Sequence, residues 1–464
     1  MDGLTEGPVS SFQEVNVRRL VDVAIVGGGA SGALTAVSLL RRGGNALRIA
    51  LVDERGRFGR GVAYSTRCAA HLLNVPVEKM SALPDDPEHF LRWMKAVEPA
   101  TRPGDFVPRA RFGQYLNQLL GSAVELRHAR AVRLLREDGA FRLELDRRPS
   151  LLARTVVLAM GNLGPAVGPL HGPSPWSSGW RSRLGPADPV LLLGTGLTMV
   201  DAVLALHAAD HQGPIHAVSR HGLLPLPHRP SPPLRVTLPA DFRRAGLRRK
   251  LRCLRAAARR EGILGGDWRP VIDSLRADTP ALWHGLSLVE RRRFLRHLRA
   301  YWDAHRHRMP PAAAAVIAEL RLSGQLQVRA GRVHRLHARD GAIEAHIQVR
   351  GAGDREVLRV AQVIDCTGPA RWIREVNDPF IRSLLEDGLA RPDDLGIGLD
   401  TDPSGAVLGA GGSPTEALYA IGPLRRGSLW ESTAVPEIRV QAVELAARLL
   451  DRAPWLDVLA GRHP

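Results

Sequence analysis

Short apolar runs and helical stretches alternate near the start of the chain. Residues 21–26 (Val-Asp-Val-Ala-Ile-Val) form a β-rich run of the kind that makes a buried parallel strand. A helical stretch at 33–42 follows, and a second apolar run occupies 48–52. This order predicts a strand–helix–strand unit with a parallel sheet, which places the chain in the α/β class.

The same order returns in the middle of the chain. An apolar run at 190–194 leads into a helical stretch at 198–208 and a strand-like run at 215–218. Self-similarity of this kind indicates a repeated structural unit. The pattern therefore predicts two Rossmann-like dinucleotide-binding domains.

Both units are followed by the same ending. The turn sequence Asp-Gly-Ala, at 138–140 and again at 340–342, lies between two strand-like runs. An apolar run that closes on glycine follows each hairpin, at Gly161 and at Gly368. A glycine at such a position lets the chain pass close to a bound dinucleotide.

A glycine-rich loop follows the first apolar run directly. Gly27 permits a tight turn, Gly29 lets backbone approach a pyrophosphate, and Gly32 lets the helix pack close to the strand. The free N–H groups at the helix start favour phosphates. Asp53, about 20 residues further on, is placed to accept hydrogen bonds from ribose hydroxyls. The predicted contacts in this first unit are Gly27, Gly29, Ala30, Ser31, Gly32 and Asp53.

The second unit carries a modified loop. Gly194 and Gly196 match the first two glycines, but Met199 stands at the third position, where a large side chain demands compensation. Ser219 and Arg220 follow the second strand, where domains that bind NAD place a carboxylate. A serine and an arginine suit a 2′-phosphate, so we expect NADPH rather than NADH. The alternative is that Arg220 merely ends a strand.

The charge of the chain calls for an explanation. The formal net charge is +17, yet the chain has only three lysines, so 61 of its 64 basic residues are arginine. Such a skew fits codon usage in a GC-rich genome better than a nucleic-acid partner, and none is expected. The densest basic stretch, 243–260, predicts an amphipathic helix with a solvated face. An acidic partner or a membrane surface is the alternative reading of that stretch.

Several classes of protein are disfavoured by what the sequence lacks. No window approaches 18 consecutive apolar residues, and residues 1–18 have no apolar segment typical of a secretory signal. We therefore expect a cytoplasmic protein with a flexible N-terminus at 1–18 and no membrane span. No histidine falls in a ligand spacing, so no metal is expected. Widely spaced cysteines, each expected to be a small buried side chain, argue against a dithiol site: Cys68, Cys253 and Cys366.

Specific strings along residues 20–450 resemble a known family of FAD/NAD(P)-binding proteins, which includes FAD-dependent urate hydroxylase and aspartate N-monooxygenase. Besides the first glycine loop, the strings that carry the resemblance are Gly59-Arg60-Gly61-Val62-Ala63-Tyr64, Leu73-Asn74-Val75-Pro76, Pro108-Arg109, Phe112 to Leu116, Gly194 to Asp201, Arg306 to Pro310, Asp365 to Pro369, Gly422 to Gly427, Trp430-Glu431 and Pro436-Glu437.

This resemblance implies a chain path and cofactors. An FAD-binding domain would run over 19–186 and return over 369–464, with an NAD(P)-binding domain inserted at 187–368. The segment from about 223 to 320 is too long for a plain crossover and indicates a helical insertion, which is either a lid or interface element or a purely structural helical cap. In the last segment we expect a strand at 417–421, a loop at Gly422 and a helix that begins near Pro436. The N-terminus of that helix would face the flavin pyrimidine ring.

The leading functional interpretation is a monooxygenase. NADPH would reduce FAD, and one atom of O₂ would pass to a small polar substrate; the cofactor supplies this chemistry. Asn74, Arg109 and Trp430 are the candidate residues near the flavin. A flavin dehydrogenase or reductase that passes electrons to a carrier is the second interpretation. The third is a non-enzymatic FAD-binding, redox-sensing module. The sequence sets neither the substrate nor the oligomeric state.

Overall fold

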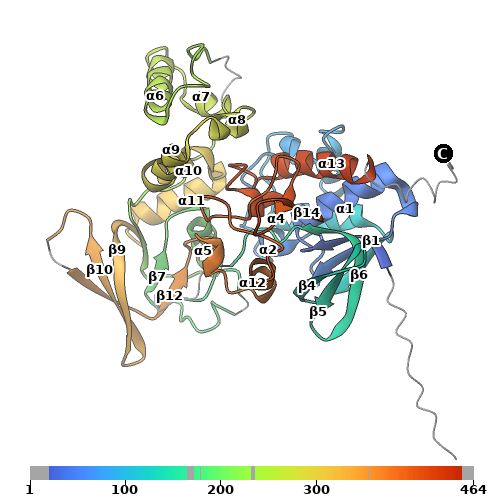
Figure 1. Cartoon of the computed structure of the whole chain (residues 1–464). Coiled ribbons are helices and arrows are strands. Elements are labelled where there is room, and N and C mark those ends of the chain that lie inside the picture. Colours follow the sequence, from blue (N-terminus) through green and yellow to red (C-terminus); the bar gives the residue numbers. More distant parts are fainter. Residues whose placement is uncertain (1–19, 165–171, 178, 231–235, 354, 452–464) are drawn as a thin grey trace, which may run out of the picture.

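The computed structural model describes residues 20–164, 172–177, 179–230, 236–353 and 355–451. Two sheets lie side by side, and helices from both ends of the chain pack on the first of them (Figure 1). The chain builds most of the first sheet, then the whole second sheet, and returns to the first for its last two strands.

The first sheet has eight strands in the order β13-β14-β6-β1-β2-β3, with β5 paired to β6 and β4 paired to β5. Its strands β14, β6, β1, β2 and β3 run parallel, whereas β4, β5 and β13 pair antiparallel. The strands of this sheet are β1 (Leu20–Val26), β2 (Ile49–Asp53), β3 (Val124–His128), β4 (Ala131–Glu137), β5 (Ala140–Leu145), β6 (Arg148–Leu158), β13 (Ala406–Leu408) and β14 (Pro414–Ala420).

Both faces of this sheet are buried, which explains why every residue of β1 except Asp22 is apolar. Val23 and Ile25 point to the face covered by helices α1 (Ala30–Gly43), α4 (Arg109–Leu120) and α13 (Val435–Asp451). Ala24 and Val26 point to the other face, together with helix α12 (Pro379–Glu386) and the β4–β5 hairpin. Shorter helices at the first face are α2 (Gly61–Tyr64) and α3 (His89–Val97).

The second sheet has six strands in the order β11-β10-β9-β8-β7-β12, of which β12, β7, β8 and β9 are parallel. Helices α5 (Leu197–His207) and α11 (Pro311–Leu322) contribute to its core. Its strands are β7 (Val190–Leu193), β8 (Ile215–Ser219), β9 (Leu326–Arg339), β10 (Ala342–Val349), β11 (Arg355–Val360) and β12 (Gln362–Asp365).

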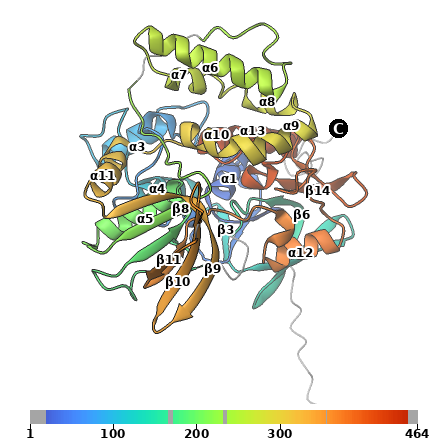
Figure 2. The same cartoon turned by 90° about the vertical axis from the view of Figure 1, so that its left-hand side faces the viewer.

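A helical insertion separates β8 from α11. In the two views it stands above the sheets, and α6 forms its outermost part, with α7 and α8 beneath it (Figures 1 and 2). Its helices are α6 (Leu247–Ile263), α7 (Arg269–Asp273), α8 (Thr279–His284), α9 (Leu288–Arg293) and α10 (Arg299–Arg306).

The predicted fold class is confirmed: the chain is α/β with two Rossmann-like units and a helical insertion. Both predicted hairpins, at 138–140 and 340–342, form turns between antiparallel strands. Element ends differ from prediction. The first helix begins at Ala30 rather than residue 33, because the glycine loop itself enters the helix. The last parallel strand is Pro414–Ala420 rather than 417–421. The expected flexible segment 1–18 lies outside the described residues.

Candidate functional site

In the first glycine loop, the fold itself requires glycine at two positions, Gly27 and Gly32, but not at Gly29. Gly27 has φ +108°, and a Cβ there would lie 2.5 Å from the carbonyl oxygen of Ala159. A Cβ at Gly32 would lie 1.9 Å from the carbonyl oxygen of Gly27, so α1 can approach β1 only without a side chain. A Cβ at Gly29 would meet only Gly61 Cα, at 3.5 Å. The absent side chain of Gly29 therefore leaves room beside the loop for a ligand.

Other predicted contacts gather at the same edge of the sheet, because the carboxyl ends of parallel strands meet there. Asp53 ends β2, and its carboxylate accepts hydrogen bonds from the N–H groups of Gly28 and Arg55, each at 2.9 Å. Gly161 follows β6, and a Cβ there would meet no atom within 4 Å. This edge thus combines an acid, open backbone and a helix N-terminus, which fits a dinucleotide.

The start of helix α13 lies beside this edge. A Cβ at Gly422 would lie 2.7 Å from Ser31 Oγ of α1. The N–H of Gly422 donates to Gln441 Oε1 at 3.1 Å, and Ser432 Oγ donates to the Gly422 carbonyl at 2.9 Å. Pro436 occupies the first turn of α13. The N-terminus of α1 therefore presents free N–H groups at this edge, and the N-terminal end of the α13 dipole lies beside it.

The second glycine loop repeats the geometry of the first. Gly194 has φ +107°, and a Cβ there would lie 2.6 Å from the carbonyl oxygen of Cys366. A Cβ at Gly196 or at Gly368 would meet no atom within 4 Å. Met199, which replaces the third glycine, has no exposed surface and lies in the core with α11. Its side chain is thus absorbed by the core, and the space beside Gly196 stays open.

Ser219 and Arg220 lie at the carboxyl end of β8. Ser219 Oγ is 2.8 Å from Thr195 Oγ1 and accepts the N–H of Gly222 at 3.1 Å. Burial, and next the positive charges of Arg371, Arg332 and Arg299, lower the pKa of Arg220. No carboxylate pairs with Arg220 within the described part of the chain.

The arginines that act on Arg220 come from separate elements. Arg332 lies on β9, Arg371 follows β12, and Arg299 begins α10 of the helical insertion. Sequence reasoning missed these three residues, because no local pattern relates them. Together they make the end of β8 strongly positive, which suits a phosphate group.

A buried ion pair joins the two units beside the second glycine loop. Arg109 of α4 and Asp201 of α5 lie 2.8 Å apart, with side chains 13% and 6% exposed. The Nε of Arg109 also donates to the Leu72 carbonyl at 2.9 Å, and His71 Nε2 lies 2.9 Å from the backbone oxygen of Asp201. Burial raises the pKa of Asp201, and the charge of Arg109 opposes that shift.

The helical insertion is attached to the segment just before α13. Glu431, which has φ +71° and is buried, accepts hydrogen bonds from Trp302 Nε1 at 2.8 Å and Arg306 Nε at 3.0 Å. Burial raises the pKa of Glu431, against the effect of Arg306. In the first turn of α13, Glu437 accepts two hydrogen bonds from Arg276, at 2.5 and 2.9 Å.

Aromatic side chains reinforce this attachment. The rings of Trp283 and Trp430 stack with centroids 5.0 Å apart, and Phe294 meets Trp430 edge-on at 5.4 Å. Trp283 Nε1 donates to the Gly427 carbonyl at 2.8 Å. The backbone oxygen of Asn74 lies 3.0 Å from the Nε2 of His228, at the start of the insertion.

The three residues predicted near the flavin therefore have structural partners. Asn74, Arg109 and Trp430 each contact the inserted part of the chain. Asp201 and Glu431, which accept so many of these contacts, were given no role from sequence, although both stand in the strings that carry the family resemblance.

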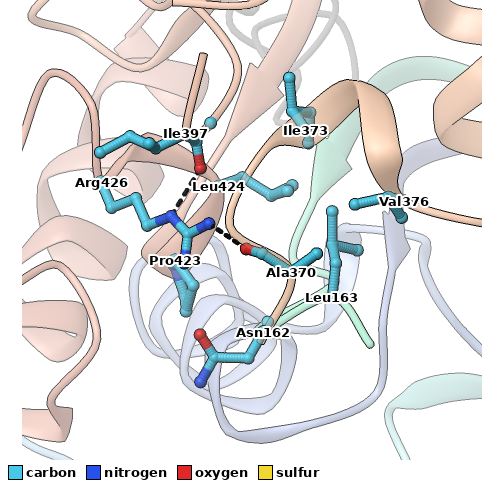
Figure 3. Close-up of a pocket in the computed structure, with 11 residues that line it drawn as sticks. Asn162, Leu163, Ala370, Ile373, Val376, Ile397, Pro423, Leu424 and Arg426 are labelled. Carbon is cyan, nitrogen blue, oxygen red and sulfur yellow. Dashed lines mark hydrogen bonds between the residues drawn. The ribbon is translucent and has the colours of Figure 1, made fainter. Parts of the chain in front are cut away.

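A small, mostly apolar pocket marks where the carboxyl edges of the two sheets converge (Figure 3). Within it, Arg426 donates to the carbonyls of Ile397 and Ala370, at 2.5 and 2.6 Å. Burial lowers the pKa of Arg426 to about 10. The N–H of Ala370 donates to the Leu163 carbonyl at 3.3 Å, so the loop after β12 lies against the loop after β6. The pocket lining consists of Gly161, Asn162, Leu163, Ala370, Ile373, Val376, Ile397, Gly398, Pro423, Leu424 and Arg426.

The cysteines are free thiols, but one expectation about them is wrong. Cys366 is buried, whereas Cys68 and Cys253 are only half-buried. Cys68 lies at the surface of the core of the second sheet, and Cys253 lies on the outlying helix α6. No disulfide forms among the described residues. No helix in the described ranges is long and apolar enough to cross a membrane.

The sequence and the fold were compared with those of known proteins. Residues 24–163 match the model of a protein family described as FAD-NAD(P)-binding. No curated protein matches the sequence. Among solved structures, the ornithine N-hydroxylase of Kutzneria sp. 744 is 15% identical with a TM-score of 0.66, and the match covers 94% of this chain and all of that one.

Two further structures are similar over nearly the whole chain. The L-lysine 6-monooxygenase of Pseudomonas syringae is 16% identical with a TM-score of 0.61, and the match covers 93% of this chain and 99% of that one. The bacillithiol disulfide reductase of Bacillus cereus is 13% identical with a TM-score of 0.56, covering 94% and 100%.

Fold and site together define a protein with two Rossmann-like units whose open edges face each other. The resemblance to FAD/NAD(P)-binding proteins is confirmed: residues 24–163 match the FAD-NAD(P)-binding family model, and the whole chain shares its fold with the solved ornithine N-hydroxylase.

Proposed function

We propose that this protein is an FAD-dependent, NADPH-using monooxygenase that hydroxylates a small polar metabolite. The observation that carries the proposal is the pair of glycine loops on converging sheet edges, in a fold shared with the ornithine N-hydroxylase and the lysine monooxygenase. The structure of the ornithine enzyme is described with reduced FAD, NADP⁺ and L-ornithine. The domain at 19–186 and 369–464 would then hold FAD, and the domain at 187–368 would hold NADPH.

The residues of the first unit fit FAD. Gly29 and Gly161 leave space for the dinucleotide, and Asp53 offers carboxylate oxygens to a ribose. The N-termini of α1 and α13 would favour the pyrophosphate and the negative charge of a reduced flavin. Gly27 and Gly32 shape the loop, while Ala30 and Ser31 begin the helix. FAD, when bound, supplies the redox and oxygen chemistry.

The residues of the second unit fit NADPH. Gly194 shapes the turn, and Gly196 and Gly368 leave space beside it. Ser219 and Arg220 would hold the 2′-phosphate, supported by the surrounding arginines. A phosphate at this point would relieve the mutual repulsion of those arginines, whereas NADH would leave it in place.

The substrate would be a small molecule that reaches the flavin together with O₂, and the cytoplasm is the proposed location. Exclusion of water from the reaction space would be the task of the domain junction around Arg426 and of the insertion that packs on Trp430.

A reductase is the second candidate, because the bacillithiol disulfide reductase shares the fold. The cysteines favour the monooxygenase: none of the three thiols is paired, and the most reactive type of arrangement, a C-x-x-C pair, does not occur in the sequence. Burial raises the pKa of the Cys366 thiol, which makes it a poor nucleophile, whereas a hydrogen bond with His71 lowers the pKa of the Cys68 thiol.

The test is oxygen incorporation. Purified protein loaded with FAD is supplied with NADPH, isotope-labelled O₂ and a panel of small polar metabolites, and products are analysed by mass spectrometry. The expected result is one labelled oxygen atom in a single product, with NADPH oxidation stimulated by that substrate. NADPH oxidation that requires an electron acceptor and labels no metabolite would establish the reductase instead.

A further inference from the structure

Helix α6 has two unlike faces. Its inward stripe packs towards α7 and contains the buried Lys250 and Ala257. Lys250 is held there by the carbonyls of Arg243 and Ala245. The helix is therefore fixed to the insertion by one side only, and its other side is free.

The outward face carries a stripe of arginines. Arg248, Arg252, Arg255 and Arg259 are spaced four, three and four residues apart, which puts them on one side of a helix. All are exposed, and within the described residues none has a hydrogen bond or ion pair. The other two arginines of the helix form ion pairs, Arg249 with Asp241 and Arg260 with Glu261.

Exposed apolar residues end the helix. Ile263 follows Arg259 by four residues, so it continues the stripe, and it is 85% exposed; Leu264, which caps the helix, is 74% exposed. Gly265 and Gly266 follow them directly. We define the arginine stripe with Ile263 and Leu264 as the basic face. From Arg248 to Ile263 it extends for about 22 Å along the helix.

The basic face is energetically unfavourable when it is exposed to water. Like charges three and four residues apart on a helix repel each other, and two large apolar side chains are left in water. Both costs disappear at a surface that combines negative charge with an apolar layer just beneath it. A nucleic acid would neutralise the arginines but would leave Ile263 and Leu264 unburied.

We propose that the basic face docks α6 onto an anionic phospholipid membrane. The arginines contact lipid phosphates, and Ile263 and Leu264 enter the boundary between headgroups and acyl chains. The position of α6 permits this, because it is the outermost element of the insertion and stands away from both sheets (Figures 1 and 2). The protein would bind the membrane peripherally with its two dinucleotide edges uncovered.

The test is flotation of the full-length, FAD-loaded protein with lipid vesicles. Phosphatidylserine mixed with phosphatidylcholine is compared with phosphatidylcholine alone, and binding to the mixed vesicles only is expected. Each arginine at an anionic surface is worth roughly a fivefold change in affinity, so replacement of the four by glutamine should weaken binding roughly several hundredfold.

A matched control replaces exposed arginines on the β9–β11 strands by glutamine and keeps the net charge equal to that of the first variant. Its residues are Arg335, Arg339, Arg355 and Arg359. This control should bind vesicles like the wild type. Equal losses in both variants would mean that only net charge matters, and would overturn the proposal.

A second variant separates a membrane from other polyanions. Ile263→Asp with Leu264→Asp should weaken vesicle binding but leave retention on heparin within the change expected from two added charges. Unchanged vesicle binding in this variant would overturn insertion. Duplex DNA or heparin bound as tightly as the mixed vesicles, by wild type and variant alike, would identify a nucleic-acid or other polyanion surface instead.

Discussion

Replacement of Arg220 by alanine tests the proposed NADPH site most directly. Arg220 lies at the end of β8 with much of its side chain in solvent. Partial burial lowers its pKa most, and the positive charges of Arg371, Arg332 and Arg299 lower it further. A charge-assisted hydrogen bond contributes about 1.5–3 kcal/mol. The lower end applies here, because solvent screens an exposed arginine and three other cations remain to attract the phosphate. We therefore expect kcat/KM for NADPH to fall about tenfold.

The selectivity of this loss is the informative quantity. NADH lacks the 2′-phosphate, so kcat/KM for NADH should barely change in the variant. Added salt should shrink the difference between the wild type and the variant, because screening weakens the interaction of exposed charges. Arg339→Ala, at the far end of β9, serves as the control and should leave both nucleotides unaffected.

Anaerobic stopped-flow reduction of bound FAD by each nucleotide is the assay, since it measures the nucleotide step without a known substrate. Equal slowing with NADPH and NADH would show that Arg220 does not contact the 2′-phosphate. No slowing with either would place the phosphate elsewhere, and Arg332→Ala and Arg371→Ala would then be measured in the same way.

Four further predictions address stability and cofactor binding. Gly29→Val should fold, because a Cβ there meets no atom closer than 3.5 Å. It should lose FAD, because the valine side chain would fill the space proposed for the pyrophosphate; normal flavin absorbance in the purified variant would contradict this. Arg109→Leu should lower the free energy of unfolding by about 3–5 kcal/mol by leaving Asp201 buried without its partner, and Asp201→Asn in the same chain should recover part of it, as denaturant titration would show. Burial lowers the pKa of His228 to about 4, so its stabilising effect is complete above pH 6.5 and is lost as pH falls towards 4. Between pH 7 and pH 5 the free energy of unfolding should therefore fall by about 1 kcal/mol less in His228→Gln than in the wild type, with partial exposure of the ring taken into account. Denaturant titration at the two pH values measures this, and an identical fall in both proteins would refute it. Alanine at all three cysteines should leave NADPH-driven flavin reduction intact in a folded protein, and loss of reduction at normal FAD content would disprove it: Cys68, Cys253 and Cys366.

Local chemistry explains why the framework could be predicted. The roles of Gly27 and Gly32 depend on backbone conformation and on contact with the next strand, so the sequence pattern carries them completely. The two Asp-Gly-Ala turns are equally local. The sequence pattern predicts a late start for the first helix because the whole motif from Gly27 to Gly32 is assigned to the loop, whereas Ala30 and Ser31 already form the helix start.

Contacts between distant segments could not be predicted. Nothing near Arg220 indicates that arginines from β9, from the loop after β12 and from α10 will surround it, and the high arginine content of the chain hides any signal. Burial of Cys68 and Cys253 was misjudged for a similar reason, because exposure depends on what packs against a residue rather than on its type. Asp201 and Glu431 become prominent only when their arginine partners arrive from another domain.

The contacts of the inserted part with the first unit have a mechanical consequence. Arg109 holds α5, Glu431 holds α10, and Asn74 holds the start of the insertion. The three contacts lie in different segments of both the first unit and the inserted part. They should therefore oppose rotation of the inserted part against the first unit. The distance between the two glycine loops is then set when the chain folds.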